Sequence, residues 1–582
     1  MPRFIQPTAL LAAAAVFAFS AAVPGRAAAP RKQTRPARPA AAPAPRNGGL
    51  GAELITQNQL RAYLTFIADD ALEGRDTPSR GLDIAARFLA ANLARLGLKP
   101  MGDDGTYFQK IVLRRTAVDP VQTSVTLGGK TFRYGEDYLI SPRGGGSAAA
   151  AFTSASLVYA GSGWVVPGKN LNAYAGLGDV RGKVLVVTGG FLPPGMDFAQ
   201  FRRLKAGVDY ETPQSYARKN GAVGIIRLPE PNMIGNWAAY RDGFSQFAGG
   251  WRMARFDEGQ SGSEAGPPGP PARGRQGAAV PEIQAGPALV EALFAGQARS
   301  AAAALTPGAA FTLSDSKTLS ATVRLTDRET TTQNVVAVLE GSDPVLKNEY
   351  VAFGAHYDHV GMRENGDPKA DNIFNGADDD GSGTTGVLAI AEAFARTRPR
   401  PKRSLLFVWH AGEEKGLWGS DYFTRFPTVP LKNIVTQLNM DMIGRSKPAG
   451  DTEPRNADLS GPTEIYAIGS KMMSRELGAL SERVNKAAGL VTFNYKYDDP
   501  DDPNRFFFRS DHFNYARRGI PIIFYFDGVH VDYHRPGDEV SKIDFAKMER
   551  VTRTVYLTGR AVADLPRRPV VDRKLPAQLG GE

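Results

Sequence analysis

Residues 350–361 read YVAFGAHYDHVG, in which an apolar run of strand length, Tyr350–Gly354, stands directly before two histidines. A helix is predicted over Thr384–Arg396, because apolar side chains from Val387 to Phe394 recur on one helical face. A second apolar run of strand length follows at Leu405–Trp409. This order of strand, helix and strand predicts an α/β sandwich with a largely buried sheet.

The same pattern extends along the chain in both directions. Further apolar runs predict strands at Ile434–Leu438, Ile465–Ile468 and Pro521–Phe526, with helices at Lys471–Ala487 and Asp544–Leu565. Nearer the N-terminus, core-facing apolar spacing predicts helices at residues 56–67 and 84–96, and strand-like runs follow at Gln109–Leu113 and Ser124–Leu127. The α/β pattern therefore accounts for most of the chain outside its middle third.

The composition and the pattern of predicted elements change from about residue 150. Two short β-rich runs, Gly182–Gly190 and Gly221–Leu228, flank a predicted helix at Pro213–Lys219, and Gly259–Gly277 is rich in Gly, Pro, Ser and Arg. No histidine precedes His356, so few catalytic residue types occur here. We therefore expect a non-catalytic insert at 150–315. It would divide a catalytic domain into parts 49–149 and 316–566, followed by a tail at 567–582.

The N-terminus predicts export. Arg3 supplies positive charge, Thr8–Val23 is a short apolar stretch, and small residues follow at Ala27–Ala29, which is the pattern of a secretory signal peptide over residues 1–29. The alternative is a retained membrane anchor. Residues 30–48 are mostly Pro, Ala and Arg and predict a disordered linker. We expect a periplasmic or extracellular protein without stable membrane insertion after signal removal, since no later segment is long and uncharged enough.

Composition excludes several classes of protein. With 582 residues the chain is expected to hold more than one domain. Its formal net charge is +10, but seven Lys and Arg residues lie in residues 1–48, which hold no acid, so the rest carries only +3. A net charge this small does not indicate a protein that binds nucleic acid. There is no cysteine, which excludes disulfides and thiolate metal sites. Composition does not indicate an oligomeric state.

Five potential metal ligands stand just after apolar runs or in the loops nearby. They are His356 in GAHYDHVG, Asp379 in NGADDDGSG, Glu414 in HAGEEKGL, Asp441 in LNMDMIG and His534 in DYHRPGDE. Ligands in α/β sheets gather outside the carboxyl ends of strands, so these positions are expected to converge at one edge. Two imidazoles and three carboxylates suit zinc or a similar divalent ion, and can hold two ions if one carboxylate bridges them.

Each candidate also has an ordinary structural interpretation. Asp379 precedes a helix and would serve as a cap, Glu414 as a solvated loop charge, Asp441 as a turn residue, and His356 as a hydrogen-bonded structural histidine. Their joint placement favours the metal site. The other histidines are assigned more weakly: His359, His410 and His530 to packing or outer positions, and His512, in the sequence SDH, to a substrate pocket or a cap.

The motifs HYDHVG, GADDDGSG, GEEKGLWGS, NMDMIG and RSDHFNYARRGIP together resemble the co-catalytic di-zinc exopeptidases, which include secreted leucyl aminopeptidases and glutamate carboxypeptidase. The resemblance covers residues 318–565 strongly and 50–145 more loosely. It implies a mixed-sheet α/β/α sandwich, and the β-rich insert resembles the protease-associated (PA) domain that many members carry.

The resemblance also implies a role for each site residue. His356 and Asp441 would bind one zinc ion, Glu414 and His534 the other, and Asp379 would bridge both, with a cis peptide bond beside it. Asp358 would hydrogen-bond the imidazole of His356 and fix its tautomer. Glu413 would be the general base, as a carboxylate that binds no metal and can take a proton.

These roles predict an exported zinc aminopeptidase that removes N-terminal residues from peptides. One alternative is a carboxypeptidase of the glutamate-releasing type, in which Arg445, Arg505 or Arg509 would meet the terminal carboxylate. Another is a glutaminyl cyclase with a single zinc ion. A third, from a different class, is a binding ectodomain without turnover, with the PA-like insert as its recognition surface.

Overall fold

The computed structural model describes most of the chain after residue 50. The described residues are 51–140, 149–190, 192–201, 204–247, 250–257, 280–363 and 367–576. The expected signal peptide at 1–29, the linker at 30–48 and the Gly-rich segment Gly259–Gly277 lie outside them. Within the described ranges no helix combines the length and the hydropathy needed to cross a membrane.

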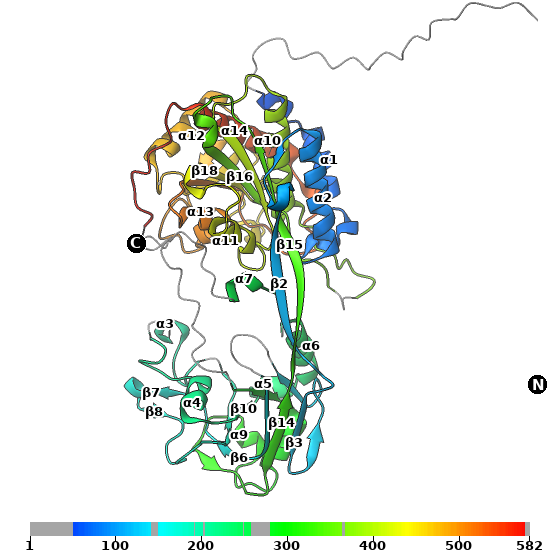
Figure 1. Cartoon of the computed structure of the whole chain (residues 1–582), viewed down its shortest axis with the longest axis vertical. Helices are drawn as coiled ribbons and strands as arrows, with labels where there is room; N and C mark the ends of the chain where they lie inside the picture. Colours follow the sequence, from blue (N-terminus) through cyan, green and yellow to red (C-terminus); the bar gives the residue numbers. More distant parts are fainter. Residues whose placement is uncertain are drawn as a thin grey trace, which may run out of the picture. The chain divides into compact units, whose positions relative to one another are not determined.

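A sheet of ten strands forms the centre of the larger part of the described chain (Figure 1). Its order is β11-β2-β15-β17-β16-β18-β21-β19-β20, with β1 paired to β15. The strands are β1 Lys99–Pro100, β2 Phe108–Val118, β11 Arg252–Met253, β15 Leu325–Leu339, β16 Tyr350–His356, β17 Ser404–His410, β18 Ile434–Met440, β19 Glu464–Ile468, β20 Thr492–Asn494 and β21 Ile522–Phe526.

The four central strands of this sheet, β17, β16, β18 and β21, run parallel to one another. β15 pairs antiparallel with β17 on one side, and β19 pairs antiparallel with β21 on the other. The sheet is therefore mixed, and the predicted mixed-sheet α/β fold is confirmed. Because the central strands are parallel, their carboxyl ends lie at one edge, where binding sites form in such sheets.

Helices cover both faces of the sheet, because successive side chains of each strand point to opposite sides. On β16, Val351 and Phe353 join a core with α1, α2, α10, α12 and α14, whereas Ala352 joins a second core with α11 and α13. The helices are α1 Gln57–Ile67, α2 Arg80–Arg95, α10 Gly383–Arg396, α11 Trp418–Arg425, α12 Arg475–Ala488, α13 His512–Ala516 and α14 Phe545–Asp564. The result is the predicted three-layer α/β/α sandwich.

A second sheet with its own cores lies between β2 and β15 in the sequence. Its order is β4-β3-β14-β6-β9-β10-β12-β5, with β13 paired to β6. The strands are β3 Ser124–Leu127, β4 Lys130–Phe132, β5 Tyr138–Ile140, β6 Ala150–Tyr159, β9 Val184–Val187, β10 Gly224–Arg227, β12 Glu282–Ala285, β13 Phe311–Thr312 and β14 Thr318–Val323. Nearby lie β7 Val165–Val166, β8 Leu171–Asn172, α3 Phe198–Phe201, α4 Pro213–Asn220, α5 Pro231–Ile234, α6 Trp237–Phe247, α8 Pro287–Phe294 and α9 Ala301–Ala304.

The boundaries of the second sheet differ from those of the expected insert at 150–315. The sheet already includes β3, β4 and β5, and it ends with β14, which leads into β15 after one residue. Conversely, β11 pairs with β2 of the first sheet, and α7, Ala254–Asp257, follows it directly. The change of composition near residue 150 thus coincides with the start of strand β6. The second sheet itself begins after β2 and ends before β15.

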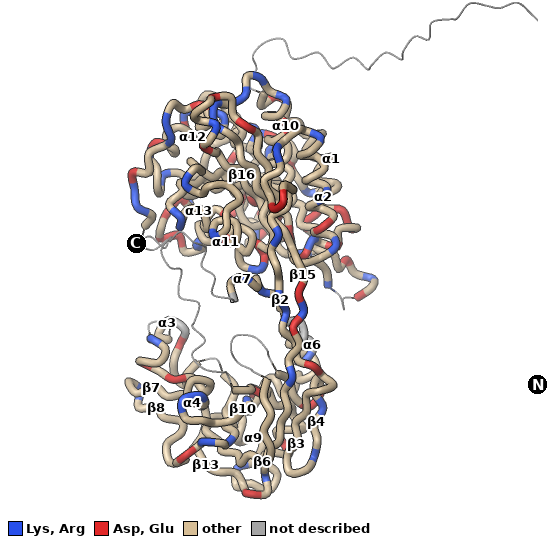
Figure 2. Tube along the Cα trace, in the orientation of Figure 1, with Lys and Arg blue, Asp and Glu red and all other residues tan. Residues whose placement is uncertain are grey.

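β2 and β15 pair antiparallel over eleven positions, from Leu325 opposite Val118 to Val335 opposite Phe108. Figure 2 shows Lys and Arg interspersed with Asp and Glu along this ribbon and along the rest of the described chain. Arg114 and Glu329 are directly opposite each other in register, and their side chains form an ion pair of 2.8 Å. Such a partly exposed pair contributes little to stability but favours this register over a shifted one.

Candidate metal centre

Three parallel strands deliver candidate ligands to the same edge of the sheet. β16 ends at His356, β17 ends four residues before Glu414, and β18 ends directly before Asp441. Asp379 comes from a different element, the irregular turn Ala377–Ser382 that leads into α10. The predicted convergence of distant sequence positions is therefore present in the structure.

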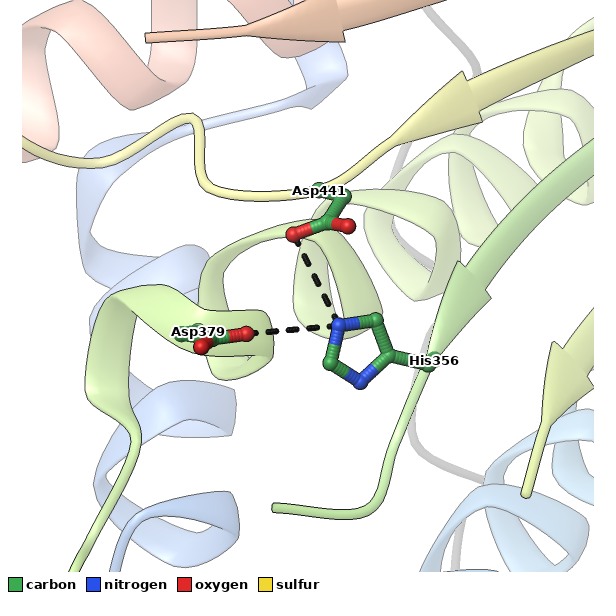
Figure 3. A group of neighbouring side chains, drawn as sticks. All are labelled: His356, Asp379 and Asp441. Atoms are coloured by element: carbon green, nitrogen blue, oxygen red, sulfur yellow. Dashed lines mark ion pairs between the residues drawn. The ribbon is translucent and has the colours of Figure 1, made fainter. Parts of the chain in front are cut away.

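A first group consists of His356, Asp379 and Asp441 (Figure 3). His356 Nε2 lies 3.3 Å from Asp379 Oδ1 and 3.6 Å from Asp441 Oδ1. All three side chains are buried. Ligand atoms that share one tetrahedral zinc at about 2.1 Å lie roughly 3.4 Å apart, so the spacing in this group suits a common ion.

The ring of His356 is oriented by a main-chain group. Its Nδ1 lies 3.2 Å from the carbonyl oxygen of Asp358, which can only accept, so Nδ1 carries the proton and Nε2 presents its lone pair to Asp379 and Asp441. The carboxylate of Asp358, expected to make this hydrogen bond, lies 3.8 Å away and instead accepts the main-chain N–H of Glu413 at 3.2 Å. Burial raises the pKa of Asp358 to about 7. Asp358 thus fixes the tautomer of His356 through its backbone.

A second group surrounds the other oxygen of Asp379. His534 Nε2 lies 3.1 Å from Asp379 Oδ2 and 3.1 Å from Glu414 Oε2. His359 Nδ1 lies 2.9 Å from Glu414 Oε1, although the sequence favours a packing role for this histidine. The only local signal for His359 is its place as a second histidine within the motif HYDH. Asp379 therefore faces one group with Oδ1 and the other with Oδ2, which is the placement expected of a bridging carboxylate.

The buried carboxylates differ in their affinity for protons. Burial alone would raise the pKa of Asp379, but its contacts with His356 and His534 hold that pKa well below the usual range. Burial, together with the neighbouring charges of Glu414 and Asp441, raises the pKa of Glu413 well above its usual value. The pKa values of two carboxylates in one site are thus shifted in opposite directions. Such opposite shifts separate proton donors from proton acceptors in active sites.

Several polar atoms of these groups are buried without a hydrogen-bond partner in the described part of the chain. They are Asp379 Oδ2, Glu414 Oε1, His534 Nε2 and both ring nitrogens of His359. Unpaired buried polar atoms cost free energy, and a divalent cation would satisfy those that converge on one point. The mixed nitrogen and oxygen donors suit zinc. The residues present therefore fit a metal centre with two positions.

The turn that carries Asp379 is held by its backbone. Asp538 Oδ2 accepts the main-chain N–H groups of Asp378 at 3.0 Å and Asp379 at 3.1 Å. The cis peptide bond expected beside Asp379 joins it to Asp380. Asp380 Oδ1 in turn accepts the N–H of Met442 at 3.1 Å, next to Asp441. The loops that carry Asp379 and Asp441 are thus tied to each other.

Arg75 links the N-terminal helical region to these loops, although no sequence pattern distinguishes it. Its fully buried guanidinium donates to the carbonyl oxygens of Tyr357 at 3.0 Å, Asn375 at 2.6 Å and Gly376 at 3.0 Å. Tyr357 follows His356 directly, and the other two acceptors precede Asp379 by a few residues. One side chain therefore sets the spacing between the loops that bring both residues together.

A pocket opens beside the first group. Its lining combines His356, Asp379, Glu413 and Asp441 with Met442, Phe506, Arg509, Phe524, Phe526, Val529 and Tyr533. His512, expected in a substrate pocket, is absent from this lining: it is fully buried, and its ring stacks on Phe524 with centroids 4.4 Å apart. Burial lowers the pKa of His512 to about 3, so the ring is neutral. Apart from the candidate metal ligands, Glu413, Arg509 and Tyr533, the residues that line the pocket are apolar.

Part of the chain is similar to a known family. Residues 334–558 match the family described as Peptidase family M28. "Leucine aminopeptidase 2" of Trichophyton rubrum is 26% identical over 269 residues, which are 42% of this chain and 48% of that protein. A protein of Leptosphaeria maculans named "Probable zinc metalloprotease" is 30% identical over 266 residues, 40% of this chain and 58% of that protein. The chain thus spans about half the length of these relatives.

A solved structure is similar over most of its length. The aminopeptidase from Aneurinibacillus sp. strain AM-1 aligns with 90% of this chain and 97% of that chain, at 18% sequence identity and a TM-score of 0.45.

Proposed function

Because residues 334–558 match peptidase family M28, we propose that this chain is an aminopeptidase that hydrolyses the N-terminal bond of peptides with two divalent metal ions, zinc above all. The observation that carries the proposal is the sharing of Asp379, whose two oxygens face separate histidine and carboxylate groups. His356, Asp441 and Asp379 would hold one ion, and Glu414, His534 and Asp379 the other.

Bound divalent ions would supply Lewis acidity, which lowers the pKa of a water molecule and polarises the scissile carbonyl. The side chain of Glu413 would transfer the proton from this water to the leaving amine. Glu413 lines the pocket, and its Oε2 lies 4.0 Å from His356 Nε2, beside the first group but outside both candidate metal groups. With its raised pKa, Glu413 can accept a proton from water at Oε2 and pass it to the leaving amine.

The lining of the pocket indicates the side chain that the substrate would place there. Phe506, Phe524, Phe526, Val529 and Met442 offer apolar surface next to the metal-binding residues. Burial of a leucine-sized side chain contributes about 1.5–3 kcal/mol relative to exposure. The pocket would therefore favour peptides with a large apolar N-terminal residue.

The proposal is tested with leucyl p-nitroanilide and its N-acetylated form. An aminopeptidase with this pocket should hydrolyse the free-amine substrate in the presence of zinc, and should prefer it to alanyl p-nitroanilide by about tenfold in kcat/KM. The acetylated form should react at least about 100-fold more slowly, because it lacks the free amine. Cleavage of acetylated peptides from a free carboxyl end, without hydrolysis of the nitroanilides, would establish the carboxypeptidase instead.

The positions of three arginines argue against the carboxypeptidase alternative. That alternative needs several arginines at the substrate carboxylate. Arg445 already pairs with Asp532 at 2.8 Å and with Asp538 at 3.5 Å. Arg505 packs over the ring of Phe508 and is not in the pocket lining, so only Arg509 of the three faces the pocket. A single guanidinium supports an aminopeptidase better than a carboxypeptidase. Absence of any peptide hydrolysis by the zinc-loaded chain would favour the binding ectodomain.

We further propose that residues 1–29 direct export to the periplasm or medium and that the second sheet is a PA-like domain. The basic and apolar pattern of the N-terminus supports export. A separate β-rich unit inserted between two strands of the catalytic sheet supports the PA-like assignment. Mass spectrometry of the N-terminus of the protein recovered outside the cytoplasm tests export, since the mature chain should begin near residue 30.

A further inference from the structure

His359 is a buried histidine without an ordinary role in the fold. Its side chain is completely buried, Nε2 has no hydrogen-bond partner among the described residues, and the 2.9 Å contact of Nδ1 with Glu414 Oε1 does not have hydrogen-bond geometry. Most buried polar groups are paired, since each unpaired one costs on the order of 1–3 kcal/mol. A histidine that only packed would be expected to hydrogen-bond through at least one ring nitrogen, as His410 Nε2 does with the hydroxyl of Tyr515 at 3.0 Å.

The ring of His359 instead faces the second group of the metal centre. Its Nδ1 lies 2.9 Å from Glu414 Oε1 and 3.8 Å from Asp379 Oδ2. The ring of His534 stands nearly perpendicular to it, with centroids 5.6 Å apart. Potential ligand atoms of His359, Asp379 and Glu414 all lie within 4.8 Å of one another. His359 thus approaches the same point in space as the expected ligands, from another side.

The main chain holds His359 in this position. Its N–H donates to the carbonyl oxygen of Arg75 at 3.2 Å, and the N–H of Gly361 donates to the carbonyl of Gly74 at 3.0 Å. These bonds turn the loop after β16 back toward the sheet edge. The backbone of the loop is therefore fixed at both ends of this turn without the contact between His359 and Glu414.

We propose that His359 is a metal ligand, so that the second ion has four protein ligands: His359, His534, Glu414 and Asp379. This inference rests on the proposed metal centre and adds a residue to it. The first position has only His356, Asp441 and Asp379. The two positions are therefore unequal: the one with two imidazoles fills first, retains its ion longer, and selects zinc-like ions over magnesium or calcium more strongly.

The test measures zinc binding by the full chain after chelation. Wild type should bind two zinc ions in titration calorimetry. The H359Q variant should lose at least tenfold in affinity at one position while the other stays within about threefold of wild type. The matched control is H410Q, which replaces another fully buried histidine whose Nε2 hydrogen-bonds to Tyr515, and this variant should keep both affinities. Circular dichroism and thermal melting establish that each variant is folded.

A measurement on the unaltered protein complements the variants. X-ray absorption at the zinc edge, with one equivalent of zinc bound, should show two imidazoles per zinc. One imidazole per zinc, or two unchanged affinities in folded H359Q, would overturn the assignment of His359 while leaving the dinuclear centre in place. A wild-type chain that binds no zinc would instead overturn the metal centre itself, and with it the proposed function.

Discussion

The E413Q variant is expected to lower kcat by about 10²–10⁴-fold while the zinc content stays at the wild-type level. The amide of glutamine keeps the size of the side chain but cannot accept a proton from water. Glu413 lines the pocket, and its Oε2 is 4.0 Å from His356 Nε2. Its neighbour Glu414 contacts His534 and His359 and would remain to bind metal.

The measurement combines kcat on leucyl p-nitroanilide with zinc per chain by mass spectrometry of the dialysed protein. The matched control is E392Q, which removes another buried carboxylate in the same domain. Glu392 accepts from Gln59 at 2.7 Å in the N-terminal helical region and touches none of the candidate ligands in the described chain. Turnover of E413Q within threefold of wild type would show that Glu413 is not the general base.

The D379N variant is expected to weaken both zinc positions together, by about 100-fold or more in affinity, and to abolish hydrolysis at micromolar zinc. Oδ1 of Asp379 lies 3.3 Å from His356 Nε2, and Oδ2 lies 3.1 Å from His534 Nε2. An asparagine offers one oxygen and one NH₂ group, which repels a cation. No orientation of the amide can serve both groups.

Calorimetric titration of D379N with zinc measures this loss, and D378N controls for the loss of a neighbouring aspartate. Asp378 accepts the N–H of Gly444 at 2.7 Å and lies 3.3 Å from His530, so it supports the loop without facing either group. D378N should therefore keep two zinc ions. Retention of both ions by D379N at wild-type affinity would contradict a bridging role.

The sequence predicts the architecture well because the relevant signals are local. Apolar runs of four to eight residues mark the central strands, and parallel strands place their carboxyl ends at one edge. The pattern of apolar runs alone therefore suffices to place His356, Glu414 and Asp441 together. His534 lies in a loop after β21 rather than directly at a strand end, so the pattern of apolar runs places it less closely than the other three.

The features that the sequence does not predict depend on contacts between distant segments. His359 turns toward the metal centre because its N–H bonds the backbone of Arg75, in the N-terminal helical region. No sequence pattern distinguishes Arg75, and only its burial against carbonyl groups of two loops shows its role. The limits of the second sheet likewise follow from the pairing of β2 with β15, which no composition change marks.

Anomalous diffraction at the zinc edge from crystals of the zinc-loaded chain tests the central claim most directly. Two peaks are predicted, both in contact with Asp379, one also with His356 and Asp441 and the other with Glu414 and His534. A single peak, or two peaks that do not share Asp379, would contradict a dinuclear centre built on that carboxylate.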